Sequence, residues 1–69
     1  MFKTLRKSKG YTQEGLAEKV GIGQSSIAMW ETGKATPSLA TMQKVAAVLG
    51  CELIEVVDCF KAESNTNQN

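Results

Sequence analysis

Four neighbouring side chains without a charge among them share one face of a predicted helix at residues 24–32. They are Gln24, Ser25, Ala28 and Met29. At about 100° per residue a helix brings them to one side, and it turns Ile27 and Trp30 to the other side, where we expect the core. Glutamine can bind adenine through N6 and N7, serine can bond to several base edges, and alanine or methionine can contact the thymine methyl group. The face therefore suits the floor of the DNA major groove.

A second interpretation is that this face is only a polar surface exposed to solvent. Exposed helix positions usually favour lysine and glutamate, and the middle of this face carries neither. The composition of the face alone leaves the two interpretations close to even. The arrangement of the neighbouring helices is what favours base recognition.

The elements that must position this face are helical. Apolar residues recur at helical spacing along the chain, and no alternation typical of a strand persists. We predict an opening helix that ends at Gly10, followed by helices at 12–20, 24–32, 39–49 and 52–60. Only Gly21, Ile22 and Gly23 separate the second helix from the third, so the two must form a bent pair.

The starts and ends of these helices have recognisable residues. Thr12 and Ser38 are good N-caps for the second and fourth helices, whereas Gly23 is a weaker N-cap for the third. Gly21 can adopt the left-handed conformation that ends a helix. The fourth helix should bury one face, formed by Leu39, Met42, Val45, Ala46 and Leu49.

Length and composition narrow the class of protein. Sixty-nine residues predict one domain, which we place at 1–60, with a polar tail at 61–69 that we expect to be disordered.

The chain has no histidine, and its two cysteines, Cys51 and Cys59, lie too far apart for a CxxC pair. We expect free thiols, with Cys51 in the core, and no metal, cofactor or small-molecule ligand. No residues suggest an enzyme, and no apolar segment suggests a membrane anchor or signal peptide, so we expect a cytoplasmic protein.

The net charge of +1 hides an uneven distribution along the chain. Residues 1–49 hold seven Lys and Arg against three Glu, which gives +4, and residues 50–69 hold one Lys against four Asp and Glu, which gives −3. One end of the molecule could therefore face phosphates while the other is turned away from them. A charged run on its own is more often a solvated surface.

The run TQEGLAEKVGIGQSSIAMWETGKATPSLATMQKVAAVLG resembles the helix-turn-helix domain of the Cro and lambdoid phage repressor family. The resemblance covers about residues 3 to 57 and rests on TQxxLAxxxG, WExGK and a PS step before an apolar helix that ends in LG. It implies an all-α, compact five-helix domain of the lambda-repressor type. The departures from the family pattern are Gly15, Gly23 and the absence of further basic residues after Lys34.

The resemblance also implies roles for individual residues. Gln24 and Ser25 correspond to the main pair that reads bases, with Met29 at another base-facing position. Gln13 resembles a glutamine that binds a phosphate and braces Gln24. The positions expected to contact phosphates, aided by amide donors around the loop after the third helix, are Thr12, Gln13, Thr32 and Lys34. Arg6 and Glu31 occupy positions that form a buried ion pair in some relatives.

We therefore expect a sequence-specific DNA-binding transcriptional regulator, most simply a repressor that inserts residues 24–32 into the major groove. One such helix reads only about four or five base pairs, so a homodimer on a near-palindromic operator is expected. Val56, Val57 and Phe60 are candidates for the dimer surface, although they could equally close the core of the monomer. The alternative function is an antitoxin-like protein-interaction module that binds a partner through its apolar C-terminal helix.

Overall fold

The computed structural model describes residues 1–64, with side chains described as far as Phe60. These residues form five helices: α1 (Phe2–Ser8), α2 (Gln13–Val20), α3 (Gln24–Glu31), α4 (Leu39–Leu49) and α5 (Leu53–Ser64). The predicted all-α fold with five helices is therefore confirmed, and its helix boundaries fall close to those expected from the sequence. The exception is α5, which continues past residue 60.

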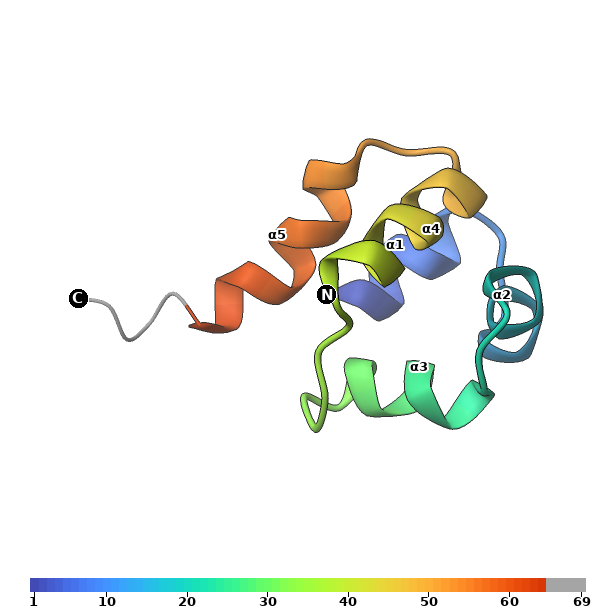
Figure 1. The fold of residues 1–69 in the computed structure, drawn as a ribbon, viewed down its shortest axis with the longest axis horizontal. Coiled ribbons are helices and arrows are strands. Elements are labelled where there is room, and N and C mark those ends of the chain that lie inside the picture. Colours follow the sequence, from blue (N-terminus) through green and yellow to red (C-terminus); the bar gives the residue numbers. More distant parts are fainter. Residues whose placement is uncertain (65–69) are drawn as a thin grey trace.

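The helices enclose a single core (Figure 1). In this view α1 and α4 lie in the middle, α2 lies at the right, α3 runs along the bottom and α5 lies at the left. α3 packs against α1 and α2, while α5 packs against α1 and α4. As a result, one long side of α3 points away from the rest of the molecule.

The predicted caps are present. The Oγ atoms of Thr12 and Ser38 accept hydrogen bonds from the backbone N–H groups of Gly15 and Thr41, which stabilises the first turns of α2 and α4. Gly21 ends α2 at φ 89°, a left-handed conformation that a residue with a Cβ adopts only at a cost. This glycine therefore allows the chain to turn from α2 into α3 within three residues.

Buried apolar side chains from all five helices fill the interior. They are Phe2, Leu16, Ala17, Val20, Ile27, Trp30, Met42, Val45, Ala46, Leu49, Val56 and Cys59. The predicted buried face of α4 holds for four of its five members. Leu39 is the exception, because it lies at the first position of α4 and is 59% exposed.

Three aromatic rings join α5 to α1 and α3. The ring of Phe60 lies 5.6 Å from that of Phe2 and 6.2 Å from that of Trp30, measured between centroids. Phe2 and Trp30 also contact each other edge to face at 5.7 Å. Val56 has no exposed surface. Of the two roles that the sequence left open for Val56, closing the core of the monomer is therefore the one the structure supports.

Both cysteines are free thiols, but the prediction that Cys51 lies in the core was wrong. Cys59 is buried in the core, whereas Cys51 is only partly buried in the connection between α4 and α5. Burial raises the pKa of both thiols, and nearby carboxylates such as Glu55 add to the effect. Each therefore stays protonated at neutral pH.

The predicted polar tail begins inside α5, because this helix extends to Ser64. The remainder of the tail, at 65–69, lies outside the described residues. No helix within the described part of the chain is long and apolar enough to cross a membrane. Among the side chains described, as far as Phe60, there is also no cluster of three or more Cys, Asp or Glu residues placed to hold a metal ion.

Candidate nucleic-acid interface

The outward face of α3 is open to solvent. Gln24, Ser25 and Met29 are exposed, Met29 to 40%, and Ala28 between them is half-buried. On the opposite side Ile27 and Trp30 are buried in the core. The helix is therefore fixed by its apolar side while its amide, hydroxyl and thioether groups remain accessible.

The C-terminal end of α3 is closed by its own backbone. Gly33 adopts a φ of 79°, and the amides of Gly33, Lys34 and Ala35 donate hydrogen bonds to carbonyls of Trp30 and Met29. This pattern is a Schellman motif. These three amides are therefore already bonded within the chain, and an amide donor for a phosphate would have to come from another residue of the loop.

The two side chains predicted to contact phosphates near this end differ in their availability. The Thr32 hydroxyl donates inward to the carbonyls of Ala28 and Met29, at 3.1 and 3.3 Å. A phosphate contact from Thr32 would have to replace these bonds. Lys34 is exposed, so its ammonium group is free to approach DNA.

The N-terminal end of α2 offers donors beside the same face. The first N–H groups of a helix have no partner within the helix and attract anions. Thr12 Oγ1 accepts from the Gly15 amide at 2.9 Å, which leaves the hydroxyl proton without an acceptor among the described residues. The Thr12 hydroxyl and the backbone N–H of Gln13, the first residue of α2, can therefore donate toward a phosphate placed at the start of this helix.

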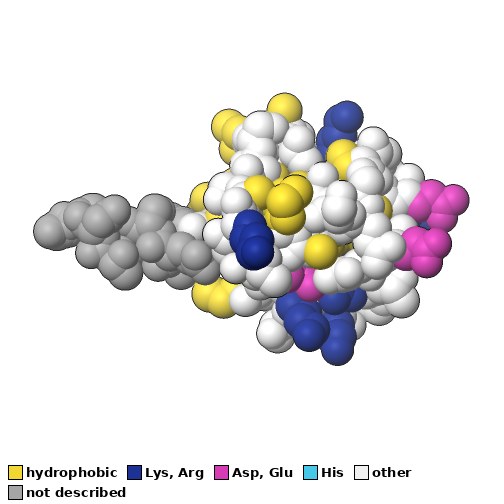
Figure 2. All heavy atoms as spheres, turned by 90° about the horizontal axis from the view of Figure 1, so that it is seen from below, with side chains coloured by type: hydrophobic (Ala, Val, Ile, Leu, Met, Phe, Trp, Pro, Cys, Tyr) yellow, Lys and Arg dark blue, Asp and Glu magenta, His cyan; other side chains and the backbone are white. Residues whose placement is uncertain are grey.

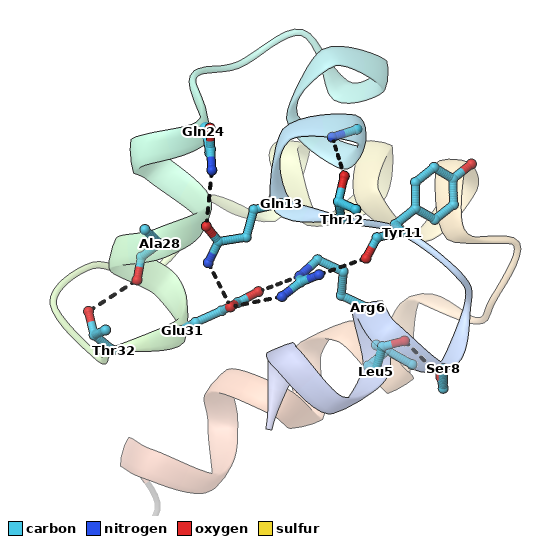
Figure 3. Close-up of polar contacts among 11 residues, drawn as sticks. Leu5, Arg6, Ser8, Tyr11, Thr12, Gln13, Gln24, Ala28, Glu31 and Thr32 are labelled. Atoms are coloured by element: carbon cyan, nitrogen blue, oxygen red, sulfur yellow. Dashed lines mark hydrogen bonds and ion pairs between the residues drawn. The ribbon is translucent and has the colours of Figure 1, made fainter.

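A chain of hydrogen bonds connects Gln24 to the interior (Figure 3). Gln24 Nε2 donates to Gln13 Oε1 at 3.3 Å, and Gln13 Nε2 donates to Glu31 Oε1 at 3.0 Å. The contact between the two glutamines is the brace that the resemblance implied. The bond from Gln13 to Glu31 was not expected, since nothing in the spacing of these two residues indicates that they meet.

The chain ends in a buried ion pair. Arg6 Nε donates to Glu31 Oε2 at 2.7 Å and Arg6 Nη2 donates to Glu31 Oε1 at 3.3 Å, with both side chains only 5% exposed. Arg6 Nη1 also donates to the Tyr11 carbonyl at 2.6 Å, and the Tyr11 hydroxyl donates to the Val48 carbonyl in α4 at 3.4 Å. The ion pair therefore ties α3 to α1 and, through Tyr11, to α4.

Glu31 is held in its ionised form. Burial is the largest single influence and opposes ionisation of the carboxyl. Hydrogen bonds from Arg6 and Gln13, together with the charges of Arg6 and Lys3, outweigh burial and lower the pKa of Glu31 below its ordinary value. At neutral pH the carboxylate is an acceptor only.

The charges around α3 are unevenly placed. Figure 2, which views the molecule from the side of α3, shows Lys and Arg side chains around a middle that is mostly uncharged or apolar. Most of the acidic side chains seen in this view gather at the right edge, on the side where Figure 1 places α2. Such an arrangement allows an uncharged helix face to meet bases while basic groups near it meet phosphates.

Comparison with known families identifies one match that covers most of the chain. The helix-turn-helix family model HTH_3 matches residues 2–56, a range that contains α1 to α4 and the first residues of α5. No solved structure gives a significant match.

Several curated proteins are similar to the chain over its helical part. An uncharacterised HTH-type transcriptional regulator of Methanothermobacter thermautotrophicus is 46% identical over 50 residues, which are 72% of this chain and 72% of that protein. The immunity repressor protein of Bacillus phage phi105 is 38% identical over 80% of this chain but only 38% of its own length. The regulator SinR of Bacillus subtilis is 39% identical over 81% of this chain and 51% of its own length.

Proposed function

The chain belongs to the HTH_3 family of helix-turn-helix proteins, the Cro and phage repressor type, and we propose that it acts as a sequence-specific repressor. Membership in this family makes it a DNA-binding transcriptional regulator and not an enzyme. The finer proposal is that a homodimer inserts α3 into the major groove of a near-palindromic operator. The names of the phage repressor and of other relatives support a repressing role.

The observation that carries the proposal is the exposed, uncharged face of α3. A helix fits the major groove when its outward side chains are small or flexible and can bond to base edges. Gln24, Ser25 and Met29 meet these requirements and are accessible. We assign base contacts to these three residues and a methyl contact to Ala28.

Phosphate contacts are expected on both sides of this face. Thr12 and Gln13 donate at the start of α2, and Lys34 contributes charge beyond the end of α3. Thr32 joins them only if its hydroxyl turns away from the α3 carbonyls. With so few contacts, the dependence of affinity on salt should be shallow, because each neutralised phosphate adds about −0.9 to the slope of log K against log salt.

Dimerisation is expected through the exposed side of α5. Val56 is buried, and both Val57 and Phe60 are partly buried against the core. The ring of Phe60 is also engaged with Phe2 and Trp30, so Val57 is the better of the two remaining candidates. Ile54, three residues before Val57 on the same helix, is 56% exposed, and we include it in the proposed dimer surface. In Figure 1 α5 lies at the opposite end from α2, so a second copy joined there leaves both α3 faces free.

Sedimentation of the protein at micromolar concentration, alone and with DNA, tests the dimer. We expect a dimer on DNA, and we expect Ile54→Lys to weaken the dimer without unfolding the monomer. A protein that remains a monomer on its operator would contradict this part of the proposal.

Selection of bound sequences from a random DNA pool tests the function itself. We expect a short two-fold motif whose half-sites are centred about 34 Å apart, or one helical turn. Recovery of no preferred sequence, together with binding that does not depend on salt, would contradict sequence-specific repression.

A further inference from the structure

We propose that Glu31 determines which base Gln24 reads, because it fixes the orientation of the Gln24 side-chain amide through Gln13. The inference rests on the proposed base contact of Gln24. Glu31 itself lies away from the exposed face and touches no base, so it is a positioning residue.

The first step is the contact between Glu31 and Gln13. An ionised carboxylate can only accept hydrogen bonds, so the group that faces Glu31 must be the NH2 end of the Gln13 amide. If the Gln13 amide were turned over, its carbonyl oxygen would lie where Nε2 now lies, 3.0 Å from Glu31 Oε1. Two acceptors at that distance repel each other. Gln13 is therefore held in one orientation.

The second step passes this orientation to Gln24. With its NH2 end on Glu31, Gln13 presents Oε1 to α3, and Gln24 Nε2 donates to it at 3.3 Å. A reversed Gln24 amide would place its own oxygen against Gln13 Oε1. The NH2 end of Gln24 therefore faces α2, as Figure 3 shows, and its Oε1 is left for DNA.

The third step is the match to a base. One hydrogen of Gln24 Nε2 is used by Gln13, so Gln24 can offer DNA one donor and one acceptor. Adenine presents the complementary pair, an acceptor at N7 and a donor at N6. Guanine presents two acceptors, N7 and O6, and would need both hydrogens of the Gln24 amide. The chain of bonds therefore favours adenine over guanine.

The anchor of this chain is rigid. Arg6 holds both oxygens of Glu31 and is itself fixed by the Tyr11 carbonyl. The Arg6 and Glu31 side chains are almost fully buried. Glu31 therefore cannot swing away to accommodate a reversed Gln13.

The test compares the affinities for two operators that differ only by adenine or guanine at the position read by Gln24. That position is identified first as the one at which Gln24→Ala loses its base preference. Gln13→Met removes the chain of bonds and keeps the ion pair. Arg6→Met combined with Glu31→Gln replaces the carboxylate by an amide that can face Gln13 either way, without leaving an unpaired buried charge.

We expect the preference for adenine over guanine to fall about tenfold in both variants, because a good bidentate contact discriminates by at least that order. Phe60→Ala is the control for lost stability. It keeps the ion pair and both glutamines, so it should lower thermal stability while the ratio of the two affinities stays unchanged. Circular dichroism melting of every variant establishes that the compared proteins are folded.

Two results would overturn the inference. One is an unchanged ratio in folded Gln13→Met. The other is a ratio that falls in Gln13→Met and is unchanged in the folded double variant, which would assign the role to Gln13 alone. Neither result touches the proposed function, which fails instead if Gln24→Ala retains the wild-type preference at every position of the operator.

Discussion

The α3 side of the molecule and the α5 side are held in place by different kinds of interaction. α3 is anchored by buried Ile27 and Trp30 and also by hydrogen bonds that run from Gln24 to Arg6. Among the described side chains of α5, none forms a hydrogen bond to another helix. This helix is held by the apolar contacts of Val56, Cys59 and Phe60. Directional bonds thus support the helix proposed to read DNA.

The difference fits the role proposed for each helix. Apolar contacts are not directional, so they cover a core without fixing a polar group to within a fraction of an ångström. A side chain that reads a base edge must keep its donor and acceptor in register with the base. The buried ion pair is therefore better understood as positioning α3 than as a source of net stability, which such pairs often fail to provide.

The largest expected effect is the loss of one member of the ion pair. Glu31→Ala leaves the buried Arg6 guanidinium without its partner and should lower the free energy of unfolding by about 3 to 5 kcal/mol. Urea denaturation measures the change. A loss below about 1 kcal/mol would mean that solvent reaches Arg6 easily and that the α3 side is held by apolar contacts alone, like α5.

The next effect concerns the apolar side. Phe60→Ala removes a partly buried ring from the contacts with Phe2 and Trp30 and should cost about 2 to 3 kcal/mol, less than a fully buried ring. Ile54→Ala on the same helix is the control, and its effect should stay within about 0.5 kcal/mol because the side chain is exposed. Equal losses for the two variants, measured by urea denaturation, would contradict the packing described for α5.

The pH dependence of stability should come from the α3 side. The pKa of Glu31 is lowered in the folded protein. The stability that its ionised carboxylate contributes is therefore complete above the unfolded-state pKa of about 4.3, and it is lost as the pH falls through the folded-state pKa. Thermal melting between neutral and acidic pH should show this loss in the wild type. The loss should be smaller in the double variant Arg6→Met, Glu31→Gln. If the double variant showed the same pH dependence as the wild type, the assignment of this loss to Glu31 would be contradicted.

The smallest expected effect is at the start of α3. Gly23 has φ −80° and ψ 150°, which serine also adopts, and a Cβ there would lie 3.7 Å from Ser25 Oγ, an ordinary contact. Gly23→Ser should add a capping hydrogen bond and stabilise the protein by a few tenths of a kcal/mol. A difference scan by calorimetry can resolve such a change, and destabilisation would show that the α2 to α3 turn requires glycine.

The fold could be predicted from the sequence because its signals are local. Thr12 and Ser38 at helix starts, Gly21 at a helix end and apolar residues at helical spacing each act within one or two turns. The face of α3 was predictable for the same reason, since all its residues belong to one short segment.

Long-range features were harder to predict. The bond from Gln13 to Glu31 joins residues of two helices, and its existence depends on the angle at which they cross. Helical spacing alone placed Leu39 on the buried face of α4, and it gave no sign that Cys59 would be more deeply buried than Cys51. Gly15, a departure from the family pattern, lies where a Cβ would come 3.0 Å from Thr12 Oγ1, which is a tight contact. Glycine there leaves room for the cap.

The exposed face of α3 is proposed to read bases, and the most direct test compares affinities for operator and random DNA in two variants. Gln24→Ala should lose about 1 to 3 kcal/mol on the operator and little on random DNA, because it removes a contact to a base. Lys34→Ala should weaken binding to both DNAs alike, because it removes a contact to the backbone. Equal losses on both DNAs for Gln24→Ala would contradict this proposal.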